Sequence, residues 1–151
     1  MIPAKLAPLL CLVLTLAACG GDGTSADEYR EQATEICETA TREAAELDPP
    51  SDSAQSVAAY GEAAAAIRER EVVALDELDP PEELAADHRL LVNASSAIVR
   101  SLNDLAAAAE REDRAAAAAA ASAGTQAATQ ARQAASDLEL PRCGQPGLPR
   151  A

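Results

Sequence analysis

Hydrophobic and polar positions recur along this chain with the period of an α-helix. In residues 26–47 the apolar positions return every three or four residues, and the same spacing is found in residues 53–78, 82–110 and 114–138. Alanine, glutamate and arginine favour helices, while the aromatic residues expected of strands are scarce. The pattern predicts an all-α fold, an antiparallel bundle of about four helices joined by short links.

The pentapeptide ELDPP marks two of these links, because it occurs at residues 46–50 and again at 77–81. Proline disrupts a helix interior and pushes the preceding residue away from helical geometry. Leu47 and Leu78 are therefore expected to be the last core residues of the first and second helices. The repeated motif is interpreted as a helix stop, with no chemistry of its own.

Residues that can cap a helix N-terminus stand before each predicted helix. Ser25, one of residues 51–53, and Asp113 are placed to accept hydrogen bonds from the free N–H groups of a first turn. Asp79 is expected to cap the third helix, with Glu82 completing a capping box.

The N-terminus has the layout of a secretory signal peptide. Lys5 is followed by an apolar run over residues 6–16 and then by small residues. The run is shorter than the ~20 apolar residues that a membrane-spanning helix needs. A cleaved signal is therefore predicted, and it implies a location outside the cytoplasm.

The end of this run, Leu16-Ala17-Ala18-Cys19, resembles the lipobox of bacterial lipoproteins. The resemblance implies that signal peptidase II cleaves between Ala18 and Cys19. It also implies that Cys19 then carries a diacylglyceryl group and a further acyl chain such as palmitate. Two or three acyl chains hold a protein on a bilayer far more firmly than one. The implied location is the cell envelope, anchored to the membrane on its extracytoplasmic side. The alternative is an ordinary secreted protein with a chance cysteine at this position.

These signals divide the chain into four parts. Residues 1–18 are the predicted signal peptide, 19–25 a lipidated flexible tether, 26–143 the helical bundle and 144–151 a disordered tail.

Two further cysteines remain in the mature chain, Cys37 and Cys143. Outside the cytoplasm such a pair indicates a disulfide, which would fasten the C-terminal segment to the first helix. The alternative, a redox-active or metal-binding pair, lacks both the CxxC spacing and a neighbouring ligand.

The chain is strongly acidic, with a formal net charge of −13 at pH 7, and its only lysine is removed with the signal peptide. Such a surface repels nucleic acid and anionic lipid head groups. No nucleic-acid partner is therefore predicted, and the membrane contact is expected to be the lipid at Cys19.

Residues with candidate chemistry are few. The single histidine, His88, is interpreted as a residue at the border of the core that bonds a nearby carboxylate, although a pH-sensitive group or a lone metal ligand is the alternative. Tyr29 and Tyr60 are expected to pack in the core with their hydroxyls at its rim. No catalytic, metal or cofactor motif is recognised, and enzymatic activity is not predicted.

Two functions remain. The favoured hypothesis is an interaction module for an envelope protein partner, which predicts an exposed apolar stripe on the bundle. The alternative is a carrier or sensor that binds a small molecule between the helices, near Tyr29, Tyr60, Leu91 and Ile98. That alternative requires a cavity large enough for a ligand.

Overall fold

The structure is a computed structural model, and it describes residues 24–144. The predicted signal peptide, Cys19 and the tail residues 145–151 lie outside the described residues. The four predicted helices are confirmed; their bounds are α1 Ala26–Ala45, α2 Ala54–Asp76, α3 Ala85–Glu110 and α4 Arg114–Asp137. No helix in the described part of the chain is both long and apolar enough to cross a membrane.

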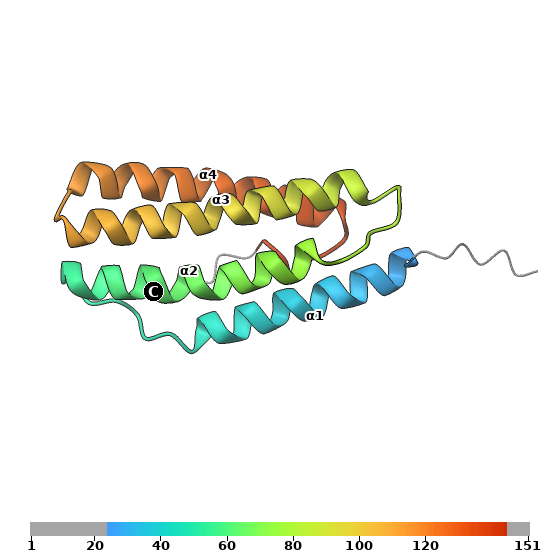
Figure 1. Cartoon of the computed structure of the whole chain (residues 1–151), viewed down its shortest axis with the longest axis horizontal. Coiled ribbons are helices and arrows are strands. Elements are labelled where there is room, and N and C mark those ends of the chain that lie inside the picture. The colour runs from blue at the N-terminus through green and yellow to red at the C-terminus, as the bar shows by residue number, and fades with distance from the viewer. Residues whose placement is uncertain (1–23, 145–151) are drawn as a thin grey trace, which may run out of the picture.

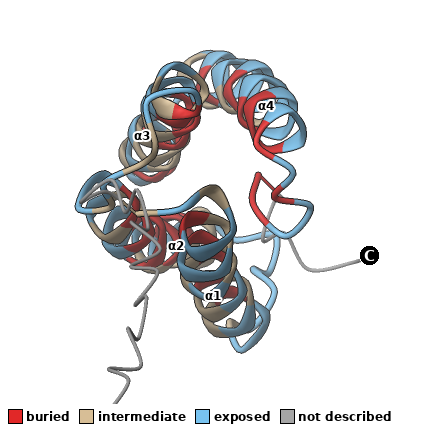
Figure 2. Cartoon of the chain, turned by 90° about the vertical axis from the view of Figure 1, so that its right-hand side faces the viewer, coloured by how far each residue is buried: buried red, intermediate tan, exposed pale blue. Residues whose placement is uncertain are grey.

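The helices pack as a sequential series in which α2 lies against α1, α3 against α2 and α4 against α3. The three links lie in turn at the left, right and left ends of the bundle in Figure 1. Within residues 24–144 no other pair of helices has backbones in close contact. The end-on view of Figure 2 shows the consequence, because α4 and α1 are separated and only the segment after α4 passes between them.

Three of the four predicted N-caps are confirmed. Ser25, Ser53 and Asp113 each accept a hydrogen bond from a backbone N–H of the following turn, at 3.0–3.2 Å. The prediction for the third helix is wrong, because α3 begins three residues after Glu82 and its N-cap, Leu84, makes no side-chain capping bond. A turn precedes the helix instead, and it directs the buried Leu84 side chain into the core.

The two copies of ELDPP end their helices in the same way. α1 stops at Ala45 and α2 at Asp76, so the leucine of each copy follows its helix by two residues. Both leucines stay half-buried against core clusters. Leu47 and Leu78 thus belong to the core margin, and the motif acts as the predicted helix stop.

α3 and α4 end in a different C-capping motif. Glu112 and Glu139 adopt positive φ angles of 54° and 61°, and the N–H groups after each helix return to its last turn. This pairing is the Schellman motif, which usually places glycine at the positive-φ position. Two glutamates take that place here, so the sequence did not reveal these chain reversals.

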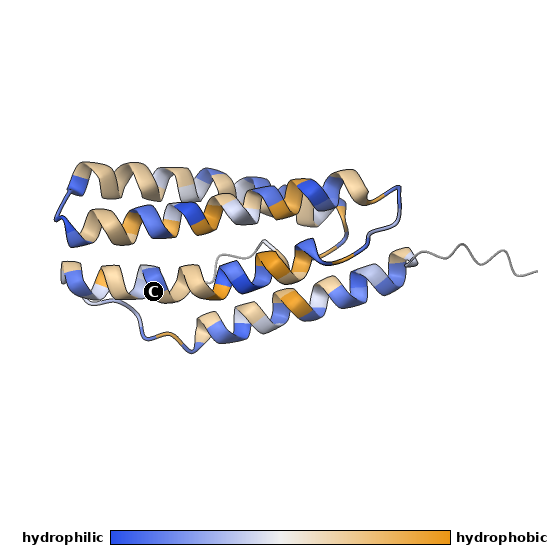
Figure 3. Cartoon of the chain, viewed as in Figure 1, coloured by the Kyte–Doolittle hydropathy of each residue, from blue (hydrophilic) through white to orange (hydrophobic). Residues whose placement is uncertain are grey.

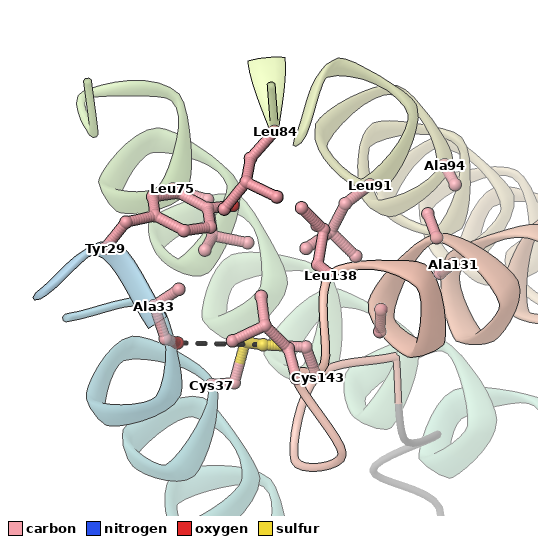
Figure 4. Close-up of a cluster of buried hydrophobic side chains, with 13 residues drawn as sticks. Tyr29, Ala33, Cys37, Leu75, Leu84, Leu91, Ala94, Ala131, Leu138 and Cys143 are labelled. Carbon is pink, nitrogen blue, oxygen red and sulfur yellow. Dashed lines mark hydrogen bonds between the residues drawn. A yellow bond between two sulfur atoms is a disulfide. The ribbon is translucent and has the colours of Figure 1, made fainter. Parts of the chain in front are cut away.

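The largest side chains of the core gather at one end of the bundle. Tyr29, Leu75, Leu91, Leu138 and Leu140 are fully buried there, and they form one cluster with both cysteines and several alanines. Figure 4 shows these side chains converging from all four helices and from the segment after α4.

The predicted disulfide lies within this cluster. Cys37 of α1 bonds Cys143, with 5.1 Å between their Cα atoms. The Cys143 sulfur also lies 3.6 Å from the carbonyl oxygen of Ala33. Arg30 of α1 adds two links to the same C-terminal segment, a hydrogen bond to the Leu138 carbonyl and an ion pair with a glutamate. The C-terminal segment therefore joins α4 to α1, which have no direct backbone contact.

The remaining length of the bundle depends on small residues. In Figure 3, α4 shows mostly the pale tan of alanine, whereas strongly hydrophobic positions lie on α1, α2 and α3. Two glycines allow close approach to α3. A Cβ at Gly61 would lie 3.1 Å from that of Ala106, and a Cβ at Gly124 would lie 2.7 Å from Ser101 Oγ. α2 and α4 are thus both drawn close to α3.

Removal of the disulfide should destabilise the fold substantially. The bond closes a loop with a sequence separation of 106 residues, and loss of a native disulfide from a small domain typically costs about 2–5 kcal/mol. We expect the double variant Cys37→Ser/Cys143→Ser to lose about this much unfolding free energy, measured by denaturant titration with circular dichroism.

A reducing agent should lower the stability of the wild type by a similar amount and leave that of the double variant unchanged. A double variant as stable as the oxidised wild type would contradict this role.

Candidate functional site

A buried pair of polar rings lies within the packed end of the bundle. The Tyr29 hydroxyl and His88 Nδ1 are hydrogen-bonded at 3.0 Å, and the two rings meet edge to face. Tyr29 is 0% exposed and His88 is 5% exposed. Burial raises the pKa of Tyr29 to about 12 and lowers the pKa of His88, a shift that the negative charge of Asp76 partly opposes. Both groups are therefore neutral near pH 7.

This geometry corrects two expectations from the sequence. The Tyr29 hydroxyl does not reach the rim of the core, and His88 Nδ1 is hydrogen-bonded to a tyrosine hydroxyl instead of a carboxylate. The physical reason is that one hydrogen bond between the Tyr29 hydroxyl and His88 Nδ1 satisfies both buried polar atoms, so neither of them needs solvent.

A mostly apolar hollow lies elsewhere, between the four helices on their alanine-rich length. It has a volume of about 370 Å³. Residues at helical spacing on α2, α3 and α4 line this hollow, and α1 contributes Ala44. Most of its wall is apolar, with aliphatic side chains from α3 and alanines from α4: Ile98, Leu102, Leu105, Ala120, Ala121 and Ala128.

The hollow opens to solvent along α4. Ala121, Thr125 and Arg132 line it and are exposed. Because α4 and α1 have no close backbone contact, no helix covers this side. The alanines of α4 are too short to reach across the gap, so the space remains unfilled. This volume falls within the range of about 300–1,000 Å³ that is typical of ligand pockets.

A small number of polar groups interrupt the apolar wall. Ser101 and Thr125 donate their hydroxyl protons to backbone carbonyls one turn earlier, at 2.8 and 2.9 Å. Tyr60 adds a phenol whose pKa is raised by burial. The charged groups of the wall are the guanidinium groups of Arg68 and Arg132.

The two arginines differ in their surroundings. Arg68 is buried and forms an ion pair with Glu71, whose pKa is raised by burial against the opposing charge of the arginine. Arg132 is exposed and donates to Thr129 Oγ1 at 3.0 Å. It forms no ion pair with a carboxylate of residues 24–144.

Two of the residues that the sequence placed near a ligand do line the cavity, and two do not. Tyr60 and Ile98 are part of the wall. Tyr29 and Leu91 belong instead to the packed cluster around the disulfide. Side-chain size explains why the four residues fall into two groups. The largest buried side chains fill the end of the bundle that holds the disulfide, and the alanine-rich length is left hollow.

The sequence did not reveal the arginines of the cavity or the hydroxyls of Ser101 and Thr125. Arg132 stands among glutamines and threonines, and such a position is usually a solvated helix face. A signal does exist in α4, where the lining positions 121, 124, 125, 128 and 132 follow helical spacing. Four of these five positions carry small side chains, which leave the space that a cavity needs.

No group of three or more metal-ligating side chains was found in the part of the chain that the structure describes. Comparison of the chain with protein-family models, with curated proteins and with solved structures gave no match.

The buried histidine should make stability depend on pH. In the unfolded chain a histidine has a pKa of about 6.5, and burial lowers the pKa of His88 in the fold. Below about pH 6.5 the histidine therefore binds a proton more readily in the unfolded state than in the native state. The unfolding free energy must fall as the pH drops through this value.

His88→Gln should remove this component, since glutamine keeps a hydrogen-bonding group near Tyr29 but does not titrate. We expect the stability advantage of the wild type over the variant, measured by urea titration, to be larger at pH 8 than at pH 5. His88 is the only histidine, so no other imidazole titrates between these two pH values. An equal advantage at both pH values would refute the assignment.

Proposed function

We propose that this protein is a lipid-anchored binding protein of the bacterial cell envelope that holds an apolar small molecule between its helices. The observation that carries the proposal is the cavity of about 370 Å³, whose wall is mostly aliphatic. Ligand pockets are typically lined by apolar side chains with a few polar groups that fix orientation. Here three hydroxyls and two guanidinium groups supply those polar positions.

The lining favours binding over catalysis. General acid–base chemistry usually requires a histidine or a carboxylate within hydrogen-bond reach of the reacting group. The described lining of the cavity contains neither, and the single histidine lies in the other cluster, bonded to Tyr29. The serine and threonine hydroxyls donate to backbone carbonyls, so no base of the lining activates them.

The interaction module that the sequence favoured has less support from the geometry. A docking face would require a contiguous apolar patch on the surface. Among the described residues the exposed large hydrophobic side chains are Val73, 52% exposed on α2, and Leu90, 58% exposed on α3. Two such residues do not form a large patch, whereas the interior holds a ready space. We therefore place the recognition site inside the bundle.

The anchor belongs to the same proposal and rests on the lipobox at residues 16–19. The bundle begins only a few residues after Cys19, and each residue spans at most about 3.3–3.6 Å. A lipidated Cys19 would therefore hold the bundle close to the membrane surface, where apolar molecules accumulate.

Binding to the cavity can be tested with the neutral fluorescent probe N-phenyl-1-naphthylamine. We expect the mature chain, residues 19–151 with Cys19→Ala, to bind the probe saturably with increased emission. Ala128→Phe, which places a large ring in the cavity wall, should weaken binding about 10-fold or more because its ring occupies the probe's space.

Ala119→Phe is the matched control, since it adds the same ring to an exposed position of α4 that does not line the cavity. Equal binding by the wild type and both variants would contradict a site in the cavity. Absence of saturable binding to the wild type would contradict the proposed function.

Lipidation can be tested in cells that express the full-length chain with an alkyne analogue of palmitate. The wild type should be labelled and recovered with membranes, and Cys19→Ala should lose the label because it lacks the acceptor sulfur. Cys11→Ala is the matched control; it removes a cysteine from the signal peptide and should leave labelling intact. Undiminished labelling of Cys19→Ala would disprove the anchor.

A further inference from the structure

We propose that the ligand of this cavity is a single-chain amphiphile with an anionic head group, held with its head at Arg132. This inference rests on the proposed binding function and adds the chemical class of the ligand. It depends on three properties of the cavity, which are its elongated form, the position of its charges and the absence of acidic groups from its described lining.

The cavity follows the helix axes. Its lining on α4 extends from Ala120 to Arg132, which corresponds to about 18 Å at roughly 1.5 Å per residue. A volume of about 370 Å³ drawn out over such a length is narrow. A linear hydrocarbon chain can lie along the length of such a space.

The charges of the wall lie at one end of this length. Arg132 is the last lining residue of α4, and it also lines a recess together with Glu139, Leu140 and Cys143. Arg68 is the last lining residue of α2, one turn before Glu71 and two turns before Leu75 of the disulfide cluster. Both charged groups of the cavity therefore lie toward the disulfide, and the α2 lining residue farthest from it is Tyr60. A charged end beside a mostly aliphatic wall suits an amphiphile.

The sign of the head group follows from the charges. Glu71 already neutralises Arg68, whereas Arg132 has no carboxylate partner within residues 24–144. No described residue that lines the cavity is acidic. Glu139 lines the adjoining recess together with Arg132, and it is already paired with Arg30 at 3.0 Å. The net charge of −13 acts at longer range and is screened beyond about 10 Å at 0.1 M salt. A carboxylate or phosphate could accept two hydrogen bonds from the Arg132 guanidinium in a bidentate contact.

Competition against the neutral probe tests this class directly. Dodecanoate, dodecanol and dodecyltrimethylammonium share one chain and differ in head-group charge. With the mature chain carrying Cys19→Ala, we expect dodecanoate to displace the probe at a concentration about 10-fold or more below that of dodecanol, because hydrogen bonds to charged groups strengthen binding by about this factor. The cationic amphiphile should be the weakest competitor.

Arg132→Gln should remove the preference for dodecanoate over dodecanol, measured within each protein as the ratio of the two competing concentrations. Arg132→Lys should keep most of the preference, since it keeps the charge. Arg89→Gln is the matched control, because Arg89 is exposed and does not line the cavity. Circular dichroism should show equal helix content in all variants.

A monoacylglycerol phosphate with the same chain length distinguishes the two sources of such a head group. Stronger competition by the phosphate indicates a membrane-derived lipid, and stronger competition by dodecanoate indicates a free fatty acid; both agree with the proposed class. Equal competition by dodecanoate and dodecanol, or a preference that survives in Arg132→Gln, overturns the inference. If the neutral probe itself does not bind, the proposed function fails instead, so the two failures are distinguishable.

Discussion

The disulfide between Cys37 and Cys143 is the bond that makes a closed unit of four helices that otherwise pack in sequence. Each helix contacts the next one, but α4 and α1 have no close backbone contact. The segment after α4 crosses this gap, and its leucines complete the packed cluster on both sides of the bond. Arg30 adds polar links to the same segment. Within residues 24–144 this closure is confined to one end of the gap between α4 and α1.

The small volume of alanine accounts for the difference between the two parts of the interior. Leucine and tyrosine side chains fill the end that holds the disulfide, and the Tyr29–His88 pair satisfies its polar atoms there. Toward the other end, alanine and glycine on α4 approach α3 closely but cannot reach α2. An empty apolar space costs contact energy, since its walls lose partner atoms. A bound apolar molecule would restore those contacts, which links the composition of the helices to the binding function we propose.

Most of the helical framework could be predicted from the sequence, for reasons that are local. Ser25, Ser53 and Asp113 cap helices because a short polar side chain reaches the N–H groups next to it. The prolines of ELDPP end helices through their own ring geometry. α3 was placed wrongly because burial of Leu84, a tertiary contact, set its start in place of the Asp79–Glu82 capping box. The Schellman turns at Glu112 and Glu139 escaped prediction because glutamate rarely adopts a positive φ.

The sequence by itself determined the class of fold, the helix stops, the acidic surface and the cysteine pair, because each depends on local propensity, on charge or on a count of residues. Tertiary structure alone decided which residues meet around the hollow. Helical spacing shows that Ala121, Thr125 and Arg132 share one face of α4. It does not show that this face lines a space opposite Tyr60 and Ile98. That outcome depends on how far apart the helix axes lie, which is set by the glycine contacts with α3 and by the disulfide at the far end.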